Sequence, residues 1–138
     1  MLNFGLRKLA DNYMQIWNAE SEGLLDIYAD PALQVEYTHF DGICNGIEDY
    51  KKILQSTYRS FPDMEVTITD ILPNKKDGSV TLFWNYSGTH QNTPLFGVNP
   101  SGKKISVNAM TVLKIKDEKV IYEKGIIDNL SLLMQLTT

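Results

Sequence analysis

The sequence contains a single cysteine, Cys44, and only two histidines, His39 and His90, in 138 residues. One cysteine excludes an intrachain disulfide framework and is compatible with a reducing compartment, so we expect a cytoplasmic protein. Neither histidine has a second ligand at a familiar spacing, and we expect no metal site. No glycine-rich stretch matches a phosphate loop or a dinucleotide fingerprint, so we expect no cofactor.

Long hydrophobic runs and an excess of positive charge are also absent. No segment approaches the roughly 20 apolar residues of a membrane-spanning helix, and the N-terminal segment lacks the apolar stretch of a signal peptide. The net charge of −4 gives no basic surface of the kind that nucleic-acid binding needs. We therefore expect neither a membrane nor a nucleic acid as partner, and one domain over residues 1–138.

The apolar pattern predicts three helices in the first part of the chain. Apolar residues recur at helical spacing over residues 6–17, and a second short helix is expected within residues 21–30, with Ser21 as its N-cap. A third helix is expected over residues 46–60, where Asn45 followed by an acid three positions later resembles a capping box. A short apolar helix is expected at the end of the chain.

Five segments have the β-branched and alternating character of strands: residues 33–38, 64–72, 80–90, 105–116 and 120–128. The last four are closely connected, through two turns and one loop that contains Pro94, Gly97, Pro100 and Gly102, which favours an antiparallel arrangement because parallel strands need a longer crossover. Helices followed by a run of strands are typical of the α+β class. A curved sheet over helices leaves a concavity at its open end, where a ligand can bind.

Motifs in the second half of the chain resemble those of a known family. They are an aromatic-x-x-x-Gly-x-His pattern at Trp84, Gly88 and His90, the loop Pro100-Ser101-Gly102-Lys103, and Asp128 followed by Leu132-Leu133-Met134-Gln135-Leu136. This set resembles the SnoaL-like polyketide cyclases, which belong to the nuclear-transport-factor-2-like superfamily. The resemblance implies an α+β cone, in which a curved antiparallel sheet wraps around three helices and encloses a pocket for an apolar small molecule.

The resemblance places Asp128 in this pocket as the general acid or base. Strand alternation puts Asp128 on the same face as Lys124, which stands where the family has a tryptophan. Lys124 would favour the ionised form of Asp128, whereas loss of solvent would oppose it. An alternative role for Asp128 is the N-cap of the last helix, because an apolar run follows it. The two roles are compatible.

His90 is the second catalytic candidate, because the family keeps a histidine at this place and imidazole carries protons near neutral pH. Its alternative role is a structural one, bracing the loop that follows Gly88. The other residues expected to contact a ligand, besides Lys124, are aromatic or apolar: Tyr13, Trp17, Tyr28, Tyr37, Trp84, Tyr86 and Met110. Aromatic residues at these spacings also suit a plain hydrophobic core.

The superfamily also contains ketosteroid isomerases, whose catalytic set is incomplete in this sequence. Tyr13 matches their first-helix tyrosine, but Tyr37 and Thr111 stand where their two aspartates are expected. Two of the three groups are missing, so we do not expect ketosteroid isomerase activity. The SnoaL-like resemblance implies a small-molecule pocket protein with cyclase-like or isomerase-like lyase chemistry, acting as a general acid and base on an apolar carbonyl compound. The alternative is a non-catalytic ligand-binding or dimeric interaction module, because fold does not determine function.

Apolar side chains occur on both faces of the predicted strands 80–90 and 105–116. Phe83, Met110 and Val112 alternate with the residues expected to face the helices. An open sheet would leave this second apolar set exposed to water. We therefore expect a homodimer that buries the outer face of the sheet.

Overall fold

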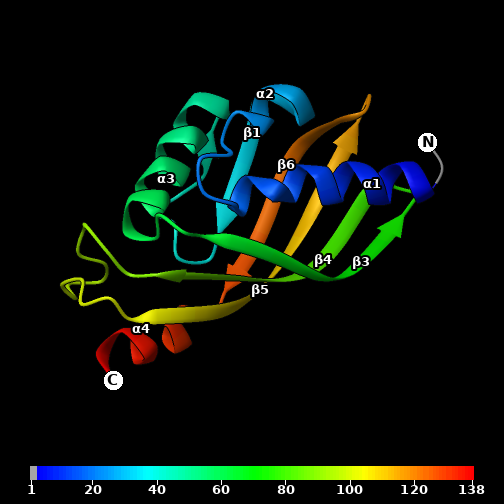
Figure 1. Cartoon of the computed structure of the whole chain (residues 1–138). Helices are drawn as coiled ribbons and strands as arrows, with labels where there is room; N and C mark the ends of the chain where they lie inside the picture. Colours follow the sequence, from blue (N-terminus) through cyan, green and yellow to red (C-terminus); the bar gives the residue numbers. More distant parts are fainter. Residues whose placement is uncertain (1–2) are drawn as a thin grey trace.

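The computed structural model describes residues 3–138, in which the first three α-helices lie on the concave face of one curved, six-stranded sheet and the C-terminal helix lies apart from them (Figure 1). The helices are α1 (Asn3–Met14), which continues into the short 3-10 helix η1 (Gln15–Trp17), α2 (Leu24–Tyr28), α3 (Ile47–Ser60) and α4 (Asn129–Thr137). The strands are β1 (Ala29–Tyr37), β2 (Cys44–Asn45), β3 (Glu65–Asn74), β4 (Ser79–Thr89), β5 (Lys104–Lys116) and β6 (Lys119–Ile127). This element order confirms the predicted α+β cone.

The strands follow the order β2-β1-β6-β5-β4-β3 across the sheet. All neighbouring strands are antiparallel except β1 and β6, which run parallel, with Tyr37 opposite Gly125. The expectation of an entirely antiparallel sheet was therefore wrong at this pair. Parallel strands need a long connection, and the chain between β1 and β6 contains α3 and four further strands.

Strand β5 shows how the sheet separates its two faces. Every second residue from Ile105 to Ile115 is buried against the helices, and the residues between them are exposed or half-buried. The same alternation gives β4 an inner face that carries Leu82, Trp84 and Tyr86. The predicted period of two is confirmed, and it directs aromatic side chains from the middle of the sheet into the interior.

Two predicted helix caps were wrong. Helix α2 begins after Gly23, and no side chain caps it, so Ser21 is not its N-cap. Asn45 belongs to β2, where it pairs with Gln34, and α3 begins after Gly46. Gly46 has φ of 90°, a conformation that glycine adopts easily. Asn45 thus pairs with β1 and does not cap α3, although the local sequence resembles a capping box.

Helix α4 attaches to the edge of β5 beyond the point where β6 ends. The side-chain amide of Gln135 accepts a hydrogen bond from the Ser106 backbone N–H at 2.8 Å and donates one to the Ser106 carbonyl at 2.9 Å. The buried side chains of Leu132 and Leu136 fix the same helix against the interior. Helix α4 therefore lies at one end of the cone, as Figure 1 shows at the bottom of the view.

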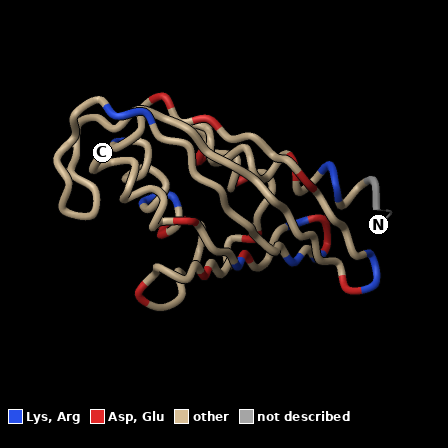
Figure 2. Tube along the Cα trace, turned by 90° about the horizontal axis from the view of Figure 1, so that it is seen from below, with Lys and Arg blue, Asp and Glu red and all other residues tan. Residues whose placement is uncertain are grey.

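Positive and negative residues are interspersed along the described trace (Figure 2). The lysines at positions 75 and 76 lie in the turn between β3 and β4, and those at 103 and 104 lie at the start of β5. None of the helices in the described residues is long and apolar enough to cross a membrane.

Candidate functional site

An internal cavity of about 250 Å³ lies at the end of the cone where α4 attaches. Its walls come from η1, the second half of α3, the loops that follow β1 and β4, the inner face of β4 and the start of α4. Ligand pockets usually measure roughly 300–1,000 Å³, whereas an engineered cavity of about 150 Å³ binds benzene. The cavity therefore suits a compound of one or two rings.

Trp17 stands at the centre of the aromatic wall. Its ring centroid lies 6.0 Å from that of Tyr86, which also lines the cavity, and 4.7 Å and 6.1 Å from those of Trp84 and Tyr37, which lie behind the wall. Phe61 continues the wall, with its ring centroid 6.1 Å from that of Tyr86. Such rings offer flat, apolar surface and favour planar ligands.

The polar groups of the cavity fall into two sets. The hydroxyls of Ser60 and Thr93 are hydrogen-bonded to each other at 2.7 Å. His39, Arg59 and Asn129 belong to the less buried part of the lining. Within the described residues, no group of three His, Cys, Asp or Glu side chains is placed to hold a metal ion.

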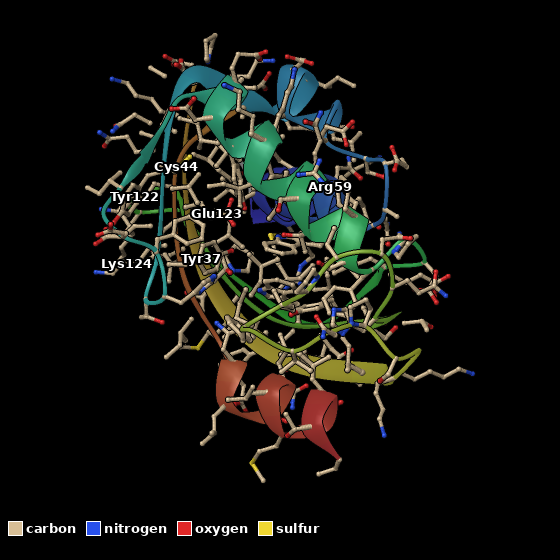
Figure 3. The ribbon with its side chains drawn as sticks, turned by 90° about the vertical axis from the view of Figure 1, so that its left-hand side faces the viewer. Tyr37, Cys44, Arg59, Tyr122, Glu123 and Lys124 are labelled. Atoms are coloured by element: carbon tan, nitrogen blue, oxygen red, sulfur yellow. The ribbon has the colours of Figure 1, made fainter. Side chains whose placement is uncertain are left out.

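A fully buried carboxylate, Glu123, lies deeper inside, on the inner face of β6. Its Oε1 accepts a hydrogen bond from the Tyr13 hydroxyl at 2.5 Å, and its Oε2 accepts one from the Tyr50 hydroxyl at 2.8 Å. The Tyr37 hydroxyl also donates to Oε2. Figure 3 shows Glu123 and Tyr37 on the inner side of the strands. One side chain thus connects α1, α3 and β1 to β6.

A directed chain of hydrogen bonds extends from this carboxylate. Tyr37 donates its single O–H proton to Glu123, so the Tyr37 oxygen accepts from the Thr111 hydroxyl 3.0 Å away. The Thr111 oxygen in turn accepts a hydrogen bond from Trp84 Nε1 at 2.9 Å. Gly125 lies between Tyr37 and Thr111 in the sheet and leaves room for the tyrosine ring.

Burial raises the pKa of Glu123, and the hydrogen bonds from the three tyrosines lower it in part. Because the folded pKa lies above the unfolded one, ionisation of Glu123 works against folding, and the three donors offset part of this effect. Burial and the Glu123 charge raise the pKa of Tyr13, Tyr37 and Tyr50 well above the usual value. The tyrosines therefore remain donors, and the cluster holds the elements together behind the cavity.

Asp128 and Lys124, both expected in the pocket, have exposed side chains. The orientation predicted for β6 was reversed, because its inward residues are Glu123, Gly125 and Ile127. Figure 3 shows Lys124 on the outer side of the strand. Asp128 caps α4, since its Oδ1 accepts the Ser131 backbone N–H at 3.0 Å. Asp128 lines a groove on the outer face of the sheet, together with Phe83, Met110, Ile126 and Leu130, which we call the outer groove. It is not part of the cavity lining, and its catalytic role stays a prediction.

Asp128→Ala is expected to destabilise the protein by about 0.5–2 kcal/mol, because an N-cap acceptor is lost. Asp128→Asn should stay within a few tenths of a kcal/mol of the parent, since asparagine is an equally good cap. Urea unfolding of both variants, followed by circular dichroism, checks this. Equal destabilisation by both substitutions would contradict a capping role.

His90, the other catalytic candidate, is 1% exposed and lies outside the cavity lining. Its Nε2 lies 2.8 Å from the Thr93 carbonyl oxygen, and its backbone N–H donates to the Lys103 carbonyl at 2.8 Å. Both contacts fix the ends of the loop between β4 and β5, part of which forms a wall of the cavity. This geometry matches the structural alternative, and a catalytic role for His90 stays a prediction.

The structure distributes the predicted ligand-binding residues over several places. Trp17 and Tyr86 line the cavity, whereas Tyr13, Tyr37 and Trp84 belong to the buried cluster behind it. Tyr28 is half-buried and packs against the core, and Met110 faces outward on β5. Sequence reasoning did not single out Glu123, Tyr50, His39 or the loop of residues 93–96. For Glu123 a signal existed, because it shares its strand face with Ile121, Gly125 and Ile127.

The family model of the SnoaL-like polyketide cyclases matches residues 7–136. The chain belongs to this family. Among solved structures, AclR, a proposed hydroxylase from Streptomyces galilaeus, is similar at a TM-score of 0.85 and 21% identity, over 99% of this chain and 87% of the other. A proposed SnoaL-like polyketide cyclase from Jannaschia sp. CCS1 is similar at a TM-score of 0.84 and 19% identity, over 99% of this chain and 94% of the other.

A further structure, from Catenulispora acidiphila, is described as a ketosteroid isomerase-like fold in complex with trimethylamine. It is similar to this SnoaL-like chain at a TM-score of 0.76 and 16% identity, over 94% of this chain and 92% of the other. No curated protein matches the sequence. At these identities the solved structures establish the fold and leave the substrate open.

Proposed function

We propose that this SnoaL-like protein binds a small, flat, apolar carbonyl compound in the 250 Å³ cavity and performs cyclase-like or isomerase-like acid/base chemistry on it. The observation that carries the proposal is the aromatic wall around Trp17, in a cavity with polar groups at His39, Arg59 and Asn129. A non-catalytic ligand-binding module is the second candidate, since the same wall would serve binding alone. The cytoplasmic location expected from the single cysteine remains part of the proposal.

The bicyclic ketone 2-tetralone is a suitable probe, because it is flat, apolar and of about the size that the cavity holds. Binding should raise the melting temperature and change tryptophan fluorescence, since Trp17 forms part of the wall. Ligand at 100 times Kd adds about 2.7 kcal/mol to the free energy of unfolding. Thr57→Phe places a ring in the cavity lining and should abolish both signals.

The matched control is Thr67→Phe, which makes the same exchange at an exposed position of β3. Its response to 2-tetralone should equal that of the parent. A response in the parent that Thr57→Phe leaves intact would show that the compound binds elsewhere. No response in the parent would contradict the proposal for bicyclic ketones.

We also propose a homodimer formed through the outer face of the sheet. Phe83, Met110 and Ile126 lie opposite one another on β4, β5 and β6 and form a continuous apolar row, with exposed fractions of 38–50%. Leu130 of α4, 70% exposed, borders the same outer groove. Adjacent exposed apolar side chains of this kind are typical of protein interfaces, and a second copy would cover the row symmetrically.

Met110→Glu is expected to shift the protein from dimer to monomer in sedimentation velocity at micromolar concentration, because it places a charge at the centre of the row. Leu72→Glu is the control, because Leu72 is also exposed and apolar but lies on β3, away from the row. It should leave the dimer intact. A monomeric parent protein at this concentration would contradict the proposed dimer.

A further inference from the structure

His39 differs from His90 in being open to a ligand. It lies in the turn after β1 and lines both the internal cavity and the outer groove. Its ring centroid lies 5.0 Å from that of Phe40, in an edge-to-face arrangement, and 6.0 Å from that of Tyr37. Among the described residues, no group forms a hydrogen bond with its imidazole. The neighbouring rings thus hold a side chain whose two nitrogens remain available.

We propose that His39 is the general base of the cavity, which removes a proton from the carbon next to the carbonyl group of a bound apolar ketone. This inference rests on the proposed function and names the residue that would perform it. The position of His39 carries the assignment, because the imidazole borders the cavity and neither of its nitrogens forms a hydrogen bond within residues 3–138.

The other ionisable groups near the cavity are less suited to this role. Glu123 is enclosed by three tyrosine hydroxyls, and Asp128 is engaged in capping α4 outside the lining. Arg59 lines the cavity, but its guanidinium group only donates hydrogen bonds, and burial raises the pKa of Tyr86. Of the described residues that line the cavity, His39 alone normally titrates between pH 5 and 8.

The proton transfer balances without a further reactant. The bond from the α-carbon to hydrogen breaks, its electron pair forms the carbon–carbon double bond of an enolate, and the proton moves to an imidazole nitrogen of His39. Negative charge then rests on the former carbonyl oxygen. Arg59 and Asn129 line the same cavity and carry N–H donors suited to this oxygen. Return of the proton to carbon restores the ketone and the free imidazole.

The pH dependence follows from the surroundings of His39. Burial lowers the pKa of His39 below its usual value, so the unprotonated form dominates at neutral pH. The charged and titratable groups around it are Tyr37 beside its ring, Arg59 in the cavity and Asp128 in the outer groove. The rate of proton removal should rise with pH through this lowered pKa and become constant by neutral pH.

Deuterium exchange at the carbons next to the carbonyl of 2-tetralone in D₂O, followed by NMR, tests the proposal. Exchange with the parent protein should be faster than in buffer alone. His39→Gln should lower the protein-dependent exchange rate by roughly 10²–10⁴-fold, the usual contribution of a general base. Binding of 2-tetralone, measured by tryptophan fluorescence, should persist in His39→Gln. Lys114→Gln, on the outer face of β5, is a control that should retain the parent rate.

The His39→Gln variant should fold normally, because the side chain is half-exposed and makes no hydrogen bond within the described residues; its melting curve checks this. Binding without exchange above buffer in the parent would overturn the assignment and leave the proposed binding intact. Loss of exchange in Asp128→Asn, with the parent rate in His39→Gln, would also overturn it. No binding of 2-tetralone would overturn both proposals together.

Discussion

Glu123→Ala is expected to lower the free energy of unfolding by roughly 3–6 kcal/mol. The substitution leaves the hydroxyls of Tyr13, Tyr37 and Tyr50 buried without their acceptor. Each unsatisfied buried donor costs about 1–3 kcal/mol, and removal of a desolvated carboxylate offsets part of the sum. Urea unfolding followed by circular dichroism measures the difference.

Tyr50→Phe removes one donor of the same cluster, whereas Glu123→Ala removes the acceptor that all three donors share. It removes one donor and leaves the Glu123 carboxylate with two, so we expect a loss of about 1.5–3 kcal/mol, as for a hydrogen bond to a charged group. Glu36→Ala is the matched control, since Glu36 accepts from Tyr122 away from the core. That hydrogen bond is only partly buried and should contribute about 0.5–1.5 kcal/mol, the typical net value of a hydrogen bond. If Glu123→Ala were no worse than Glu36→Ala, the carboxylate would not stabilise the fold.

Gly125→Ala is expected to destabilise the protein by about 3 kcal/mol or more. A Cβ atom at this position would lie 2.3 Å from Cε1 of Tyr37, 2.8 Å from the Thr111 hydroxyl oxygen and 2.9 Å from the Met110 carbonyl oxygen. Overpacking alone costs typically 1–3 kcal/mol. Displacement of Tyr37 would in addition break its hydrogen bond to Glu123.

Gly23→Ala is the control for this substitution. No atom lies within 4 Å of the Cβ that it would add, and its φ of −62° suits alanine. It should leave stability unchanged or raise it by up to about 1 kcal/mol, because alanine restricts the unfolded chain. Denaturant midpoints measured side by side compare the two variants. Similar stabilities for both would show that Tyr37 does not need the space above Gly125.

The parts of the fold that depend on local periodicity could be predicted from the sequence. The alternation in β5 is a property of neighbouring residues, and it correctly assigned Val107 and Leu113 to one face and Met110 to the other. The parallel pairing of β1 with β6 could not be predicted in this way, because it joins segments that lie far apart in the chain. The incorrect cap at Asn45 has the same origin, since β1 determines its conformation.

The candidate site was predicted less completely for a related reason. Strand alternation puts Glu123 on the face opposite Asp128, and the family resemblance assigned the face of Asp128 to the pocket, whereas the structure turns the face of Glu123 inward. The partners that allow Glu123 to be buried lie 110, 86 and 73 residues away along the chain. No pattern of neighbouring residues predicts that three tyrosines so far apart in the sequence contact the same carboxylate. Trp17 and Tyr86, two of the residues expected to contact a ligand, line the cavity, because large aromatic side chains on inner faces tend to meet; their contact with a ligand stays a prediction.

The contact between Gln135 and Ser106 also concerns pairing between strand edges of different copies of this chain. The part of β5 beyond the end of β6 is a short free strand edge, and free edges recruit strands from other molecules. The Gln135 amide, with one donor and one acceptor at 2.9 and 2.8 Å, imitates a neighbouring backbone unit at this edge. A helix side chain thereby occupies the two backbone groups with which a strand of another molecule would pair at that position.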